Sequence, residues 1–412
     1  MNAVAGARPS VPGSLPRVGE KEKARNQGID LLRGLSILLV ILNHIGLRVP
    51  LAHTALGAYL PHRLLQSLNY EGYEAVFVFF VISGFLITNH SLRRWNGLER
   101  IDFGAFYARR FARIVPCLLV LVFVLSALDL LGVQDYVIKH ADQSLPRAIA
   151  AALGLHLNWY EGHTGYLPGG WDVLWSLSIE EMFYIGFPVV CFLIRREWVL
   201  APLLILFALS LPATHAALAG NEIWQEKAYL PGMAAIAMGV LGALIAARFA
   251  PPRRWITTAP CIAGALGLAA VLLASNILWP VLHDGYMLLL TFSAMCLVVG
   301  LHWRETKGWR TKGWRRPLPG FGWLCSFGRL SYEIYLTHMF VVYAAVRAFK
   351  ATGGNIGLGY LWYLPVMIVC WLLGVLVARF FSIPCDRALR GRLLEPESWQ
   401  VAGEPAVAKE QS

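Results

Sequence analysis

The sequence predicts an all-α polytopic membrane protein with about ten transmembrane helices, one short re-entrant or interfacial helix, and both termini in the cytoplasm. Of its 412 residues, 57% are hydrophobic and only 15% are charged, whereas soluble domains carry about a quarter charged residues. Apolar runs long enough for a helix to cross the hydrocarbon layer recur along the chain. Lys and Arg gather in alternate connecting segments, so the net charge of +11 indicates membrane topology rather than a nucleic-acid partner.

Ten apolar runs are the candidate spans. They cover residues 31–48, 73–90, 114–133, 172–194, 198–217, 229–249, 255–275, 282–302, 322–347 and 360–382. One further apolar run, at 145–157, is too short to cross. With the N-terminus inside, most Lys and Arg fall in cytoplasmic segments, and this bias would collapse if residues 145–157 also crossed. We therefore expect the loops at 91–113 and 303–321 in the cytoplasm and the segment 134–171 outside.

The chain divides into three parts. We expect residues 1–27 to form a cytoplasmic N-terminal tail, residues 28–392 the transmembrane domain, and residues 393–412 a disordered cytoplasmic tail. The seven cysteines show neither metal-ligand spacing nor a disulfide framework. We expect no metal.

The first span carries two ionisable residues, Arg33 and His44. Eleven residues amount to three helical turns plus about 20°, so both side chains lie on one face, roughly 16 Å apart along the axis. Ionisable groups inside a span are costly and mark candidate functional sites, and imidazole is the usual general base near neutral pH. The structural alternative is that Arg33 reaches lipid phosphate and His44 bonds a neighbouring helix.

The second span contains Ser83 and Gly84, and the loop that follows carries Arg109, Arg110 and Arg113. A glycine at mid-span lets a ligand or another helix backbone approach closely. Arg110 and Arg113 share a helix face, and arginine forks bind phosphate bidentately. Simple helix packing at Gly84 and positive-inside anchoring by the arginines are the structural alternatives.

The fourth and ninth spans add two polar stripes. Glu180 shares a face with Ser176 and Tyr184, and its carboxylate could orient a histidine from another helix. In the ninth span Ser331, Tyr335 and His338 lie on one face, where hydrogen bonding between helices is the structural alternative. The outer segment 158–170 is rich in aromatic residues and glycine, which suits a sugar ring and a membrane interface equally well.

Together, and in this order, these elements resemble the acyltransferase 3 family of membrane O-acyltransferases over residues 29–390. The resemblance is carried by the Arg-x10-His element at Arg33 and His44 and by four further segments. These are the glycine-containing FFVISGFL region within 71–86, the FYARRFARIVP loop at 106–116, WSLSIEEMFY at 175–184 and SYEIYLTH at 331–338. Met182 stands where Gln is common in the family.

The resemblance implies transfer of an acyl group, usually acetyl, from cytosolic acyl-CoA to a hydroxyl of a carbohydrate, lipid-linked glycan or small molecule. The expected location is the bacterial inner membrane. The expected catalytic residues are His44 as general base, Glu180 to orient it, and Arg33. The residues expected to bind the acyl-CoA co-substrate are Arg109, Arg110, Arg113, Ser83 and Gly84. Those expected at the acceptor are Trp175, Tyr335 and His338.

A transporter or flippase of a glycan or lipid-linked substrate is the competing class, because such proteins also place acids and histidines in spans. No inverted repeat is visible in this sequence, although transporter folds often show one. Release of free CoA thiol in the presence of acceptor would distinguish the two classes.

Overall fold

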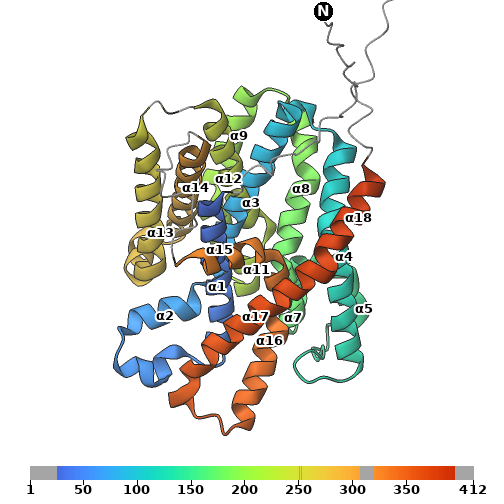
Figure 1. Ribbon diagram of the computed structural model, residues 1–412, viewed down its shortest axis with the longest axis vertical. Helices are drawn as coiled ribbons and strands as arrows, with labels where there is room; N and C mark the ends of the chain where they lie inside the picture. The colour runs from blue at the N-terminus through green and yellow to red at the C-terminus, as the bar shows by residue number, and fades with distance from the viewer. Residues whose placement is uncertain (1–25, 250, 252, 307–319, 395–412) are drawn as a thin grey trace, which may run out of the picture.

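The computed structural model describes residues 26–249, 251, 253–306 and 320–394, and within these ranges every regular element is a helix (Figure 1). The tails expected at 1–27 and 393–412, apart from their innermost residues, lie outside the described part. So does most of the loop expected at 303–321.

Eight segments of the described chain are long and apolar enough to cross a membrane, which confirms an all-α polytopic architecture. They are α1 (Gln27–Gly46), α3 (Gly72–Trp95), α4 (Phe103–Leu130), α7 and α8 (Gly169–Asp172 and Leu174–Ile194), α11 and α12 (Glu222–Lys227 and Tyr229–Arg248), α13 (Arg254–Leu282), α14 (Gly285–Thr306), and the run of η5 (Ile356–Trp362), α17 (Tyr363–Val377), η6 (Ala378–Ser382) and α18 (Ile383–Leu393).

Two of the ten expected spans differ from a single long apolar helix. Residues 198–217 form α9 (Glu197–Leu209) and α10 (Leu211–Ala216), and the first turn of the second helix contains Pro212, whose ring favours a helix start. Residues 322–347 form α15 (Gly322–Arg329) and α16 (Ser331–Ala351), which meet at Leu330. The α16 helix has the length of a span, but its polar stripe keeps it out of the eight apolar segments.

Short helices complete the chain at the ends of the long ones. They are η1 (Leu51–His53), η2 (Ala55–Ala58), α2 (His62–Tyr70), η3 (Leu98–Arg100), α5 (Leu145–Leu153) and α6 (Leu157–Thr164). The α5 helix has nine residues, as expected for a segment too short to cross. In Figure 1 it lies at the lower end of the helical layer, whereas α3 ends and α4 begins at the upper end.

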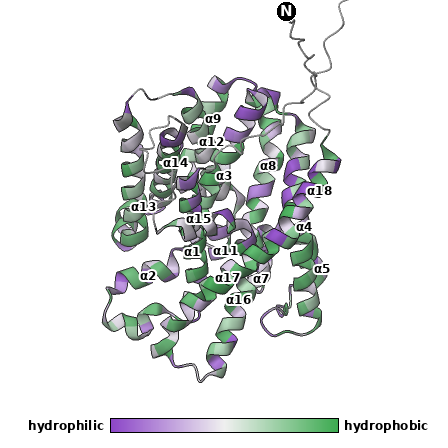
Figure 2. Ribbon diagram, in the orientation of Figure 1, coloured by the Kyte–Doolittle hydropathy of each residue, from purple (hydrophilic) through white to green (hydrophobic). Residues whose placement is uncertain are grey.

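The α1 helix lies near the centre of the molecule, where it packs against α3, α15 and α16 (Figure 1). Its first turn is capped by Asn26, whose side chain accepts a hydrogen bond of 3.1 Å from the Ile29 amide. Figure 2 shows apolar residues along the outer helices, and among them Phe123 and Val281 are 73% and 76% exposed. Such outward apolar faces suit contact with lipid. Polar side chains are costly in lipid, so those of α1 and α16 face the interior of the helical bundle.

Candidate active site

A cavity of about 660 Å³ opens among α1, α3, α4, α8, α15, α16 and α18. Five arginines line it, and they come from four helices: Arg33, Arg110, Arg113, Arg329 and Arg390. Four acids also line it: Glu180, Glu181, Glu333 and Asp386. The cavity therefore combines a cluster of cations with fewer counter-charges, which suits an anionic ligand.

Arg33 reaches the cavity from α1 and is held by α16. Its Nε and Nη2 donate hydrogen bonds of 3.2 and 2.8 Å to the Ser331 hydroxyl. The two motif segments around Arg33 and Ser331 thus meet in space although they are far apart in sequence. This contact fixes the position of the guanidinium beside the cavity.

Arg110 and Arg113 project from the first turns of α4, whose N-terminus is capped by the Asp102 carboxylate. The Arg110 guanidinium lies over the Tyr184 ring, 3.6 Å from its centroid, a cation–π geometry. Arg113 pairs with Glu333 at 2.9 Å, and it donates to Ser382 at 2.9 Å. Both predicted phosphate-binding arginines therefore have fixed positions at the cavity wall, whereas Arg109 is not among the lining residues.

Glu180 lies at the cavity, but its hydrogen bonds differ from those expected. We expected its carboxylate to orient the His44 imidazole. In the structure it accepts a bond from Ser83 and a second from Tyr184, the latter at 3.0 Å. The α3 and α8 helices are in contact, and this packing gives the Glu180 carboxylate a hydroxyl partner from α3. Ser83 lines the cavity and contacts this acid of α8.

Tyr335 and Ser176 form the boundary of the cavity on the side of His338. Their hydroxyls are 2.7 Å apart, and Tyr335 also donates to the Val173 carbonyl at 2.9 Å. Both residues line the cavity. They join α16 to the start of α8, so the two polar stripes predicted for these helices meet directly.

The two histidines lie beyond this boundary. The His44 ring faces the His338 ring with centroids 5.1 Å apart, and the His338 ring is 5.8 Å from that of Tyr335. Neither histidine is among the residues that line the cavity. Arg33 therefore lines the cavity, whereas His44 on the same helix does not. On α16, Tyr335 lies between Ser331, which contacts Arg33, and His338, which faces His44.

Two of the expected ligand-binding residues pack against other helices instead. A Cβ added to Gly84 would collide with the Ile236 carbonyl of α12, so glycine is needed there for close helix packing. The Trp175 ring packs against Tyr73 and Phe80 rather than lining the cavity. These contacts favour the structural alternative at Gly84 and a core role for Trp175.

Three charged residues of the cavity lie outside the motif segments that the sequence analysis identified: Arg329, Asp386 and Arg390. Asp386 and Arg390 form an ion pair of 2.8 Å, one helical turn apart on α18. The spacing of this pair is visible in the sequence, but a basic helix near the cytoplasmic end of a chain is also typical of topology. Only the packing of α18 on α4 brings the pair to the cavity.

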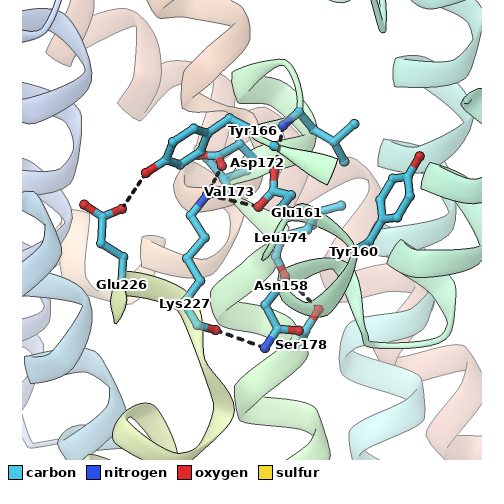
Figure 3. Close-up of polar contacts among 12 residues, drawn as sticks. Asn158, Tyr160, Glu161, Tyr166, Asp172, Val173, Leu174, Ser178, Glu226 and Lys227 are labelled. Carbon is cyan, nitrogen blue, oxygen red and sulfur yellow. Dashed lines mark hydrogen bonds and ion pairs between the residues drawn. The ribbon is translucent and has the colours of Figure 1, made fainter. Parts of the chain in front are cut away.

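A second polar cluster, which we call the outer cluster, consists of Glu161, Tyr166, Asp172, Glu226 and Lys227 (Figure 3). Lys227 is buried and pairs with Glu161 at 3.0 Å and with Asp172. Burial raises the pKa of the Tyr166 hydroxyl, which therefore stays protonated and donates to Glu226 at 3.1 Å. The cluster ties α6 and α11 to α7, immediately before the Val173 carbonyl that Tyr335 contacts.

No solved structure matches this chain. The family described as an acyltransferase domain, acyltransferase 3, matches residues 26–380. A peptidoglycan O-acetyltransferase, OatA, of Listeria monocytogenes is 29% identical over 211 residues, which are 50% of this chain and 29% of that protein. The O-acetyltransferase OatA of Staphylococcus aureus is 32% identical over 157 residues, or 35% of this chain and 24% of its own. The alignments thus cover less than a third of either relative.

The fold and its buried charged cavity define an integral, multi-pass membrane protein with a polar site inside its helical bundle. The chain belongs to the acyltransferase 3 family, as the motif resemblance predicted.

Proposed function

We propose that this protein is an O-acyltransferase that moves an acyl group, acetyl in the simplest case, from cytosolic acyl-CoA to a hydroxyl of a carbohydrate, lipid-linked glycan or small-molecule acceptor. The observation that carries the proposal is the arginine-lined cavity whose boundary at Tyr335 adjoins the His44 and His338 pair. Its location is a bacterial cytoplasmic membrane.

The cavity suits the donor for two reasons. The CoA head carries several phosphate charges, and arginine is the side chain best shaped to bind them. The acyl thioester lies at the end of a long flexible arm, which fits a site whose cations and imidazoles lie at different depths. In this arrangement Arg33, Arg110 and Arg113 hold the phosphates, and the arm extends toward Tyr335.

The transfer needs one proton carrier, and His44 supplies it. The imidazole accepts the proton of the acceptor hydroxyl while that oxygen attacks the thioester carbonyl carbon. The carbon–sulfur bond then breaks, and the thiolate takes the proton from the imidazolium. The products are an O-acyl ester and CoA thiol. The Tyr335 hydroxyl already donates its hydrogen to the Val173 carbonyl, so the donor that stabilises the developing oxyanion is a different group.

The separation between the arginine side of the cavity and the histidine pair suits a reaction with donor and acceptor on opposite sides of the membrane. Arg110 and Arg113 lie in the N-terminal half of α4 and Arg390 lies in the last turn of α18. The start of α4 and the end of α18 are at the upper side of Figure 1. The α5 and α7 helices lie toward the lower side of Figure 1, and α7 carries Asp172 of the outer cluster. We therefore assign the arginine side to the cytoplasm, together with both termini, and the acceptor side to the exterior.

The experiment uses the full chain in lipid nanodiscs with acetyl-CoA, and it follows free thiol and acetylated product. Soluble peptidoglycan fragments are the first acceptor to test, because one relative is named a peptidoglycan O-acetyltransferase. We expect acceptor-dependent release of CoA thiol. If the protein instead carries glycan or lipid across vesicles without consuming acetyl-CoA, the transporter alternative is correct.

A further inference from the structure

One ring nitrogen of His338 is hydrogen-bonded, and the other has no hydrogen-bond partner among the described residues. The residue is fully buried on α16. Its Nδ1 lies 2.8 Å from the Tyr335 carbonyl oxygen and 3.3 Å from that of Ile334. A carbonyl oxygen only accepts hydrogen bonds, so Nδ1 carries the proton and Nε2 of the neutral ring is a bare acceptor. Within the described residues, this Nε2 is buried and has no hydrogen-bond partner.

An unpaired acceptor in a buried site is costly, and native proteins seldom leave one without a role. The ring next to His338 on the side of α1 is His44, 5.1 Å away between centroids and tilted by 43°. In the orientation seen here Nε2 of His338 accepts no hydrogen bond from His44. Ring nitrogens lie at the ring edges, however, so at this separation a rotation of the His44 ring brings a nitrogen of each ring within hydrogen-bonding distance. The tyrosine on its other side, Tyr335, already donates its hydroxyl to Val173.

We propose that His338 is a positioning residue, which accepts a hydrogen bond from one N–H of His44 through its Nε2 and so fixes the tautomer of the general base. The proposal rests on the proposed function of His44. The other nitrogen of His44 is then left unprotonated and available to the acceptor hydroxyl. When His44 takes up that proton, both its nitrogens carry hydrogen, and Nε2 of His338 still accepts from one of them.

This role is the one that we expected of Glu180. A carboxylate, a carbonyl or another acceptor can orient a catalytic imidazole, and the choice determines how strongly the imidazolium is stabilised. Glu180 is engaged with Ser83 and Tyr184. His338 is a neutral acceptor whose own orientation is set by the backbone of α16, so its Nε2 has a defined position.

Two amide variants separate positioning from packing. The amide of Asn overlaps Nδ1 of histidine, so His338→Asn keeps the donor to the Tyr335 carbonyl and removes the acceptor at the Nε2 position. The amide of Gln reaches the Nε2 position, so His338→Gln keeps an acceptor for His44 and gives up the Nδ1 donor. If His338 only packs against its own helix, His338→Asn should retain more of the wild-type behaviour than His338→Gln. If His338 positions His44, His338→Gln should retain more.

The first measurement needs no acceptor. Histidine ¹⁵N spectra of the full-length protein in bilayers, assigned by comparison with His44→Ala, report which nitrogen of His44 carries hydrogen. We expect a single tautomer in the wild type and in His338→Gln, and a mixture in His338→Asn. Thr337→Ser, next to His338 on α16, is the control for general disturbance of the helix. A single unchanged tautomer in His338→Asn would overturn the proposal.

The second measurement is kinetic, with acetyl-CoA as donor. Loss of the partner that orients a metal-binding histidine costs about 10–100-fold, and we take the same size of effect for a neutral partner of His44. We expect a fall of this size in kcat for His338→Asn and for His338→Phe, an unchanged KM for acetyl-CoA, and a smaller fall for His338→Gln. A kcat for His338→Asn equal to that of the wild type would contradict the positioning role. A wild type that never releases CoA thiol, although the His44 tautomer depends on His338, would instead contradict the proposed function.

Discussion

The imidazole rings of His44 and His338 face each other at 5.1 Å, although one lies on the first helix of the chain and the other on α16. This contact places the predicted general base beside a second buried imidazole instead of a carboxylate. His44→Ala should therefore lower the rate of acyl transfer by about 10²–10⁴-fold, the usual cost of losing a general base. Expression and membrane insertion should stay near wild type, because the His44 side chain is only partly buried.

The measurement is CoA thiol release by purified protein at saturating acetyl-CoA, with elution volume on gel filtration as the control for folding. A folded His44→Ala protein with full activity would show that the base lies elsewhere.

The arginines of α4 give the second prediction. If Arg110 and Arg113 only set topology, Lys at both positions should have no effect, because orientation depends on charge and not on shape. If they hold phosphate, Lys loses the bidentate fork. A charge-assisted hydrogen bond contributes about 1.5–3 kcal/mol, so the Kd for CoA should rise by roughly ten-fold or more.

Binding of CoA and of acetyl-pantetheine, measured at fixed salt, checks this prediction. The pantetheine lacks the nucleotide phosphates, and its affinity should change little. Arg248→Lys is the matched control, because Arg248 is an exposed residue paired with Glu197 and does not line the cavity. Equal CoA affinity in the double Lys variant and the wild type would leave these arginines as topology signals.

Glu180→Gln tests the acid at the cavity. The substitution keeps the shape of the side chain and removes the charge that accepts from Ser83 and Tyr184. We expect a large fall in kcat with little change in affinity for acyl-CoA, because the carboxylate balances the nearby arginines along the path of the reacting group. Glu181→Gln is the matched comparison on the same helix. Full activity in Glu180→Gln beside an inactive Glu181→Gln would assign the role to Glu181.

The outer cluster should matter for stability. Lys227 is buried between two carboxylates, and removing one partner of a buried ion pair typically costs about 3–5 kcal/mol. Lys227→Met should thus lower the midpoint of thermal unfolding in detergent markedly. Arg347→Met is the control, because Arg347 forms a half-exposed pair with Asp135, and such pairs contribute about 0–1 kcal/mol. Equal midpoints for the two variants would show that the cluster is not a stabilising element.

Topology can be tested with single cysteines in a background without the seven native ones. Glu99→Cys lies between α3 and α4, and Asp142→Cys lies between α4 and α5. A membrane-impermeant thiol reagent applied to intact cells should label position 142 and leave position 99 unlabelled until the cells are opened. Labelling of both from outside would exclude the proposed orientation.

The sequence by itself determined the fold class and most of the polar residues of the site. Hydrophobic length and charge bias act along the chain, so they are visible without a structure, and they indicated a polytopic helical protein correctly. The same holds for Arg33, Ser83, Glu180 and Tyr335, because a polar residue inside an apolar run is costly and therefore conspicuous. Arg110 and Arg113 were visible from their spacing, which places both on one helix face. All six line the cavity.

Only the tertiary structure decided which of these residues meet. Helical periodicity places Arg33 and His44 on one face of α1, but it does not specify what packs against each. The packing of α16 on α1 brings Ser331 into contact with Arg33, and His338 into contact with His44. The packing of α3 on α8 brings Ser83 into contact with Glu180. From the sequence, Gly84 could allow close approach of either a ligand or another helix. The structure shows that it allows close approach of α12, at the Ile236 carbonyl. These choices depend on contacts between distant segments, which side-chain shape and helix packing determine and local pattern does not.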